Sequence, residues 1–177
     1  MAFEIGVPQI DFNMRVEINE APGFEWQTQS SMDIFKGKRV VLFGLPGAFT
    51  PTCSSTHVPG FDDNYETILE HGFDDVYCLS VNDSFVMNAW FKQLDVKNVK
   101  PLPDGSGKFT RTLGMLVDKD NLGFGMRSWR YSAVVEDGMI KHMFVEPGLR
   151  DNADNDPFEV SDVYTMLEYL KQQYPKG

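Results

Sequence analysis

The residue best suited to chemistry in this chain is Cys53, which follows a turn rich in proline and glycine. An apolar segment, Val40 to Phe43, precedes the turn, and Pro46 and Pro51 within it each fix φ and remove a backbone donor. We therefore expect a stiff turn that enters a helix at Cys53. Unpaired N–H groups and the positive end of the helix dipole favour an ionised thiolate at that position. The pattern predicts that Cys53 is a nucleophile.

A buried structural cysteine is the alternative, because most isolated cysteines act as small apolar side chains. Two observations favour a reactive one. Thr50 lies three residues before Cys53, on the same side of a forming helical turn, so its hydroxyl can face the sulfur or a substrate oxygen. The flanking residues are proline, glycine, threonine and serine, which are not typical of a core.

The second cysteine, Cys78, lies in an apolar segment between Tyr77 and Leu79. This context is typical of a strand buried on both faces, and it favours a small structural side chain. Two cysteines at this spacing match neither a zinc site nor a disulfide framework. His57, His71 and His142 show no metal-ligand spacing either, so we expect no metal and no bound cofactor.

Two apolar strands should position Cys53 and Cys78. We expect a central strand at Arg39 to Leu45 and a second at Val76 to Val81, both with the continuous apolar character of strands covered by helices. The other predicted elements are, in order, an N-terminal hairpin or extended arm within Pro8 to Phe24, a helix carrying Phe61, Tyr65, Ile68 and Leu69 that ends at His71-Gly72, a helix through Phe85 to Trp90 capped by Asn82 or Asp83, a short strand at Asn98 to Leu102, and a short helix at Phe109 to Leu113.

The last third of the chain indicates a hairpin and a closing helix. Apolar runs at Tyr131 to Val135 and Met139 to Val145 flank Asp137-Gly138, a strong hairpin signal. Gly123 to Arg127 is expected to be loop, and Asp151 to Asp156 a solvated loop. Helical spacing then predicts an amphipathic helix carrying Val160, Val163, Tyr164, Leu167 and Leu170. Together these elements predict an α/β domain, residues 1–177, with a mixed sheet flanked by helices.

Composition excludes several classes of partner. The formal net charge of -10 at pH 7 argues against nucleic-acid binding, which requires a basic surface, and against an anionic membrane surface. No apolar run approaches the roughly 20 residues that span a bilayer. Residues Met1 to Ile5 lack the basic and apolar regions of a signal peptide. We expect a cytoplasmic enzyme or binding domain.

Residues Pro46 to Ser54 resemble the active-site motif of peroxiredoxins, Pro-x-x-x-Thr-x-x-Cys. Longer segments resemble the peroxiredoxin-five, or plant type II, branch: His57 to Phe61, Ser80 to Asp83 and Arg130 to Ser132. Ser80 to Trp90 and Gly123 to Ser132 also resemble the peroxiredoxin part of bacterial peroxiredoxin–glutaredoxin hybrids. The resemblance covers nearly the whole chain.

This resemblance implies a thioredoxin-like fold and reduction of hydrogen peroxide and organic hydroperoxides to water and alcohols. Its catalytic residues match Pro46, Thr50, Cys53 and Arg130. Arg130 would place a fixed positive charge beside the sulfur and hold the peroxide, Thr50 would hydrogen-bond the peroxide, and Pro46 would shield the thiolate. Arg127, three positions earlier, is the rival for the arginine, and the Arg-Tyr-Ser context favours Arg130.

The resemblance leaves the reductant open. Attack on peroxide converts Cys53 into a sulfenic acid, which a second thiol must reduce. In the plant type II group a cysteine matching Cys78 is considered the resolving partner, whereas the hybrids rely on glutathione and glutaredoxin. We expect glutathione and glutaredoxin here, with a thioredoxin-reduced enzyme that resolves through Cys78 as the alternative.

Two further alternatives come from other functional classes: a peroxide sensor that relays oxidation to a partner protein, and an interaction domain with a vestigial site. The complete set of Pro46, Thr50, Cys53 and Arg130 speaks against the second. The family resemblance also suggests a homodimer.

Overall fold

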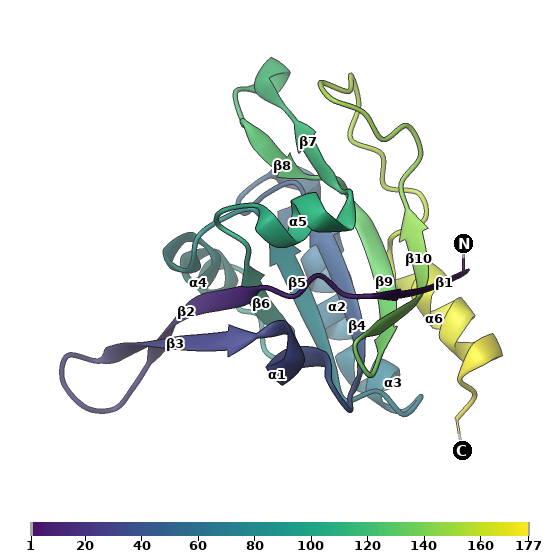
Figure 1. Ribbon diagram of the computed structural model, residues 1–177, viewed down its shortest axis with the longest axis horizontal. Helices are drawn as coiled ribbons and strands as arrows, with labels where there is room; N and C mark the ends of the chain where they lie inside the picture. Colours follow the sequence, from purple (N-terminus) through teal and green to yellow (C-terminus); the bar gives the residue numbers. More distant parts are fainter. Residues whose placement is uncertain (1, 177) are drawn as a thin grey trace.

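The protein is built on a six-stranded mixed sheet with strand order β1-β10-β9-β4-β5-β6 (Figure 1). The computed structural model describes residues 2–176, so Met1 and Gly177 of the predicted domain lie outside the described residues. Strands β4, β5 and β6 are parallel, and β9, β10 and β1 add to them in antiparallel pairs, which confirms the predicted mixed sheet. The strands are β1 (Ala2–Gly6), β4 (Arg39–Leu45), β5 (Asp75–Ser80), β6 (Lys100–Pro103), β9 (Tyr131–Glu136) and β10 (Met139–Val145).

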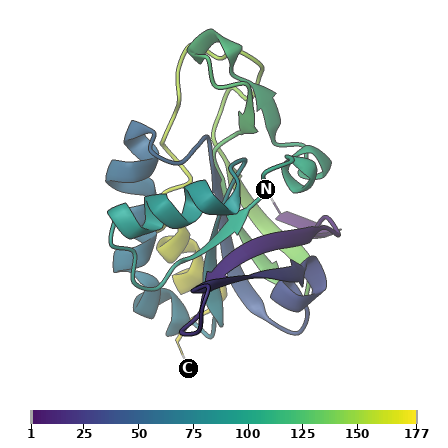
Figure 2. The same cartoon turned by 90° about the vertical axis from the view of Figure 1, so that its left-hand side faces the viewer.

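Both faces of the sheet are covered, and each carries its own core. Val41 and Phe43 of β4 point to one core, while Val40 and Leu42 point to the other. The first core is closed by α2 (Val58–Asp63), α3 (Tyr65–Leu69), α4 (Ser84–Gln93) and α6 (Val163–Gln173). The second is closed by the hairpin of β2 (Asp11–Glu17) and β3 (Phe24–Ser30), by α1 (Ser31–Phe35) and by α5 (Lys108–Leu113). Figure 2 shows these two layers on opposite sides of the sheet.

The β9–β10 hairpin forms where the Asp-Gly pair predicts it. Asp137 and Gly138 have φ of 49° and 76°, the positive values that a tight two-residue hairpin turn requires. The hairpin matters because β9 pairs antiparallel with β4, with Gly44 opposite Tyr131. Arg130, one residue before Tyr131, therefore lies at the end of β4 where the turn toward Cys53 begins.

One loop prediction is wrong. Met126 and Arg127 belong to a short strand, β8 (Met126–Ser128), which pairs antiparallel with β7 (Leu116–Asp118). The glycines that favoured a loop make the hairpin connection instead, since Gly123 and Gly125 adopt φ of 74° and 71° after the 3₁₀ turn Asp120–Leu122.

Two predicted helices have different limits. The helix expected from Phe61 to Leu69 is interrupted at Asn64, which has φ of -106° and ψ of 14°. The last helix begins at Val163 and not at Val160, because Asp162 caps it by accepting the N–H groups of Tyr164 and Thr165. The N–H of Val160 donates to the carboxylate of Glu146 instead. The N-terminal hairpin is present, but its second strand continues to Ser30.

Among residues 2–176, no helix combines the length and the apolar character needed to cross a membrane.

Candidate active site

A tight turn after β4 leads into the helix that carries Cys53. Helical structure begins at Pro51, and the N–H of Ser54 donates to the carbonyl of Thr50 at 3.0 Å. Phe49 adopts a left-handed φ of 65°, which reverses the chain before the helix. The hydroxyl of Thr50 donates to the carbonyl of Gly47 at 2.7 Å, so its hydrogen is engaged and its lone pairs can accept.

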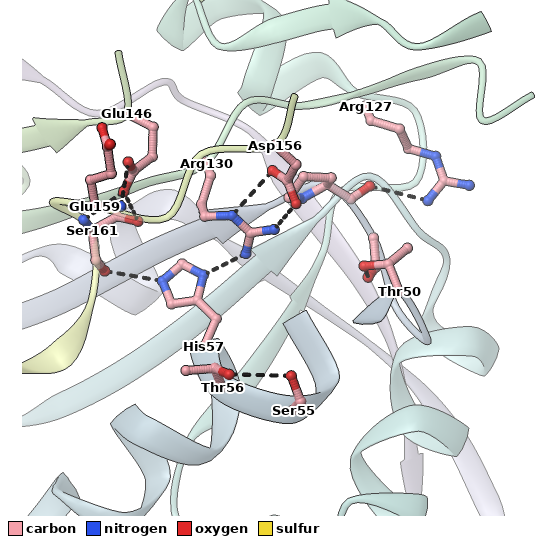
Figure 3. A network of polar contacts seen from close by, with 12 residues as sticks. Thr50, Ser55, Thr56, His57, Arg127, Arg130, Glu146, Asp156, Glu159 and Ser161 are labelled. Atoms are coloured by element: carbon pink, nitrogen blue, oxygen red, sulfur yellow. Dashed lines mark hydrogen bonds and ion pairs between the residues drawn. The ribbon is translucent and has the colours of Figure 1, made fainter. Parts of the chain in front are cut away.

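Two side chains from distant strands hold this turn. The Asn82 carbonyl oxygen, just beyond β5, accepts the N–H of Ala48 at 3.0 Å. Arg127 of β8 donates from Nη1 to the carbonyl of Pro46 at 3.2 Å. A Cβ at Gly47 would lie 2.3 Å from that Nη1, so only glycine permits this approach. Arg127 thus supports the backbone of the turn (Figure 3).

Cys53 lies in the first turns of the helix, as the sequence predicts, and its side chain is fully buried. Residues Cys53–His57 form a π-helical turn (η1), in which the N–H of Val58 donates to the carbonyl of Cys53. Such widened turns recur at functional sites. Pro51 has no N–H and the N–H of Ser54 is engaged by Thr50, so the amides of Thr52 and Cys53 are the ones in this first turn that a bound oxygen atom could use.

Arg130 lies beside Cys53 and is held by three hydrogen bonds. Its Nε and Nη2 donate to Oδ1 and Oδ2 of Asp156 at 3.3 and 2.5 Å, and its Nη1 donates to Nδ1 of His57 at 3.0 Å. Burial by itself lowers the pKa of Arg130, but the charges and hydrogen bonds of Cys53 and Asp156 outweigh burial and raise it. The sulfur of Cys53 is therefore within electrostatic reach of a permanent positive charge.

His57 is neutral in this site, and its partners define its tautomer. Its Nε2 lies 3.1 Å from the carbonyl of Ser161, which can only accept, so Nε2 carries the hydrogen. Nδ1 is then free to accept from Arg130. Burial and the charge of Arg130 hold the pKa of His57 well below its usual value. The ring packs between Phe43 and Phe158 in tilted contacts, with centroids 4.8 and 4.9 Å away.

The carbonyl that holds His57 is itself fixed by a buried carboxylate. Glu146, just after β10, accepts the N–H groups of Glu159, Val160 and Ser161 and the hydroxyl of Ser161, at 2.6 to 2.9 Å. A chain of hydrogen bonds thus runs from Glu146 through Ser161 and His57 to Arg130 (Figure 3).

Cys78 lies in the middle of β5, fully buried, opposite Phe43 of β4 and in the same core as Cys53. Its strand is paired on its other side with β6, where Pro101 is its neighbour. Burial, together with the nearby Cys53, raises the pKa of the Cys78 thiol well above its usual value, against the opposing effect of Arg130. Both cysteines are free thiols.

The structure brings Pro46, Thr50, Cys53 and Arg130 together at the end of β4, and Cys78 of β5 lies in the same core as Cys53. Sequence reasoning missed two residues of the site, His57 and Asp156. His57 follows Cys53 by four positions, a spacing that places both on one side of a helix and could have identified it. The loop Asp151 to Asp156 is largely exposed as expected, but Asp156 binds Arg130 and Ala153 is buried. No local pattern distinguishes Asp156 from its acidic neighbours.

A buried cysteine at a helix start, with a guanidinium beside it on a thioredoxin-like sheet, defines a thiol-dependent redox enzyme. Comparison with known proteins narrows this class. The Redoxin family model matches residues 20–167. Peroxiredoxin sll1621 of Synechocystis is 56% identical, over 93% of this chain and 89% of that protein. The hybrid peroxiredoxin hyPrx5 of Haemophilus influenzae is 46% identical, over 95% of this chain and 66% of that protein.

A solved structure agrees with these relatives. The Plasmodium falciparum antioxidant protein, a 1-Cys peroxiredoxin, superposes with a TM-score of 0.91 at 34% identity, over 96% of this chain and 99% of that one. The chain belongs to the Redoxin family and is a peroxiredoxin, an enzyme with thiol peroxidase activity.

The neutral state of His57 predicts a pH dependence of stability. Its pKa is lowered in the folded protein, so below about pH 6.5 the unfolded chain binds a proton that the native state does not. Stability therefore falls as the pH drops through this window, by up to about 1.4 kcal/mol per pH unit. His57→Asn keeps an acceptor near Arg130 but does not titrate, so its free energy of unfolding should fall less steeply between pH 7.5 and 5.5.

Urea unfolding of the unmodified protein and of His57→Asn at several pH values measures this difference. The carboxylates are the same in both proteins, so their contribution to the pH dependence cancels in the comparison. Parallel pH profiles would show that His57 is not held neutral.

Proposed function

We propose that this peroxiredoxin reduces hydrogen peroxide and organic hydroperoxides through a sulfenic acid on Cys53, and that glutathione and glutaredoxin regenerate it. The observation that supports the peroxide chemistry best is the buried guanidinium of Arg130 beside the Cys53 sulfur. A positive charge at that place favours the thiolate, which is the nucleophilic form of cysteine.

The proposed reaction is a displacement at oxygen. The Cys53 thiolate attacks one peroxide oxygen, the O–O bond breaks with its electron pair on the other oxygen, and that oxygen leaves as water or an alcohol after taking up a proton. Arg130 would stabilise the negative charge that moves onto the leaving oxygen. Thr50, whose own hydrogen is engaged by Gly47, would accept a hydrogen bond from the peroxide O–H. Pro46 would keep bulk water from the sulfur.

The surroundings of Cys78 support an external reductant. Its strand is paired on both sides, and its thiol is buried with a raised pKa, so it is mostly protonated and a poor nucleophile. In the proposed cycle, glutathione condenses with the Cys53 sulfenic acid to give a mixed disulfide and water. A second thiol exchange, assisted by glutaredoxin, then releases the Cys53 thiol and oxidised glutathione.

One observation favours the second candidate, a thioredoxin-reduced enzyme that resolves through Cys78. Cys53 and Cys78 lie in the same core, and the charge of Cys53 acts on the Cys78 thiol. Both thiols are free, so a Cys53–Cys78 disulfide would require the two sulfur atoms to move to a bonding distance of about 2 Å.

We propose a single domain over residues 1–177, a homodimer, and a reducing compartment such as the cytoplasm, where glutathione is abundant. The exposed side chains of Phe49 and Met126, in the turn and in the strand that supports it, offer apolar surface for a second copy.

The peroxide step is tested by three substitutions. Cys53→Ser should abolish peroxidase turnover. Arg130→Ala should lower the rate constant for hydrogen peroxide by about a hundredfold or more, because it removes the charge and the donors at the sulfur. Arg127→Ala should cost less, within about tenfold, because that side chain donates to the carbonyl of Pro46 and only its charge reaches Cys53. Stopped-flow fluorescence of the reduced protein measures each rate, and the reverse ranking of the arginines would show that their roles are exchanged.

The regeneration step is tested by Cys78→Ser. With glutathione and glutaredoxin, we expect the variant to turn over within about twofold of the unmodified protein, because serine replaces a buried thiol that the cycle does not use. Steady-state peroxide consumption with glutaredoxin and with thioredoxin, measured side by side, checks this. A variant that stalls after one turnover with both reductants would establish Cys78 as the resolving cysteine.

A further inference from the structure

The carboxylate of Asp156 binds one edge of the Arg130 guanidinium. The bonds from Nε and Nη2 use both carboxylate oxygens, a two-point geometry that fixes the plane of the group as well as its position. His57 takes a third N–H from the other side. Because a guanidinium has five N–H groups, two remain, and they are left to serve the Cys53 sulfur and a peroxide oxygen.

Asp156 lies in a loop and its side chain is 37% exposed, yet the loop is fastened on both sides of it. On one side, the N–H of Asp118 donates to Asp151 at 2.8 Å, and the N–H of Asn152 donates to the carbonyl of Asp118 at 2.7 Å. On the other side, Glu146 binds the three successive amides from Glu159 to Ser161. The chain between these anchors is short, so Asp156 is held against Arg130.

We propose that Asp156 is a positioning residue for the peroxidase reaction: it is the counter-ion that orients Arg130 and offsets part of its charge at Cys53. The residue does not touch the peroxide. It acts through Arg130, whose remaining N–H groups it turns toward the sulfur.

Other charged or titratable groups also face this pair. Cys53 and the neutral His57 approach from the Cys53 helix, and Cys78 from β5. Lys119, buried over the Trp129 ring at 5.4 Å, approaches from the end of β7, and Asp156 and Cys53 act on its charge. Arg127 approaches from β8. Asp156 is thus a carboxylate among several cations, so removing its charge should make the site more positive.

The test compares Asp156→Asn with Asp154→Asn in the full-length reduced protein. Asp154 lies in the same loop, is 95% exposed and pairs only with Arg150 among the described ion pairs, so it is a matched control. Two quantities are measured without any thiol reductant: the rate constant for hydrogen peroxide, by stopped-flow fluorescence, and the pH profile of iodoacetamide alkylation at Cys53, by mass spectrometry of its peptide. The outcome is therefore independent of the reductant proposed above.

For Asp156→Asn we expect the peroxide rate constant to fall about tenfold to a hundredfold, because the remaining N–H groups of Arg130 no longer hold a peroxide oxygen in line with the sulfur. We also expect the midpoint of the alkylation profile to move to lower pH by about half a unit or more, because a negative charge has been removed. Asp156→Glu restores the carboxylate and should return the midpoint toward that of the unmodified protein. Asp154→Asn should match the unmodified protein in both measurements.

An unchanged peroxide rate would overturn the assignment. So would a lowered rate with an alkylation midpoint that is unmoved or moved to higher pH, because the loss would then not come from the counter-ion of Arg130. Thermal unfolding is recorded for each variant, and Asp156→Ser, measured in the same way, replaces Asp156→Asn if the latter does not fold.

Discussion

A guanidinium that is only 1% exposed is costly to remove from water unless hydrogen bonds and an opposite charge replace the solvent. The structure meets this requirement for Arg130 with three groups from two parts of the chain: His57 and the sulfur of Cys53 from the helix after β4, and Asp156 from the loop before α6. His57 supplies an acceptor without a positive charge, because burial and Arg130 keep it neutral. Asp156 supplies the negative charge.

The topology of the sheet brings the groups around Arg130 to one place. The parallel strands β4 and β5 end on the same side as the turn toward Cys53, and Asn82, after β5, holds that turn by the N–H of Ala48. The antiparallel β9 brings Arg130 to the same end of β4 from a place about eighty residues later in the chain. The polar network beyond β10, centred on Glu146, then completes the support of His57 through Ser161. The ends of β4, β5, β9 and β10 therefore meet at the site.

Much of the fold could be predicted from the sequence, because its signals are local. The apolar runs at β4 and β5 indicate strands covered on both faces, and Asp137-Gly138 favours the hairpin that carries β9. The predictions of secondary structure are wrong where a residue distant in the sequence determines the backbone hydrogen bonds. Met126 to Ser128 is too short a strand to show periodicity and forms only because β7 lies beside it. Val160 has helical spacing, but Glu146 takes its N–H.

The residues of the site also divide into those that local sequence predicts and those that it does not. The sequence around Cys53 predicts the turn, the helix start and the nearby Thr50, all within a few residues. Only the resemblance to peroxiredoxins identifies Arg130 as a site residue, since nothing local in the sequence links it to Cys53. Asp156 is surrounded by acidic and amide side chains typical of a solvated loop, and only the anchors at Asp118 and Glu146 make it part of the site. Charge that is fixed by long-range contacts leaves no local pattern.

The most direct test of this account is the rate constant for hydrogen peroxide of the reduced Arg130→Lys variant, measured by stopped-flow fluorescence. Lysine keeps the positive charge but cannot span both oxygens of Asp156 and donate to His57 and the sulfur at once. If the geometry of the guanidinium is what the surrounding network maintains, the rate constant should fall by about a hundredfold despite the retained charge. A rate constant within about twofold of the unmodified protein would contradict the account, because charge alone would then suffice.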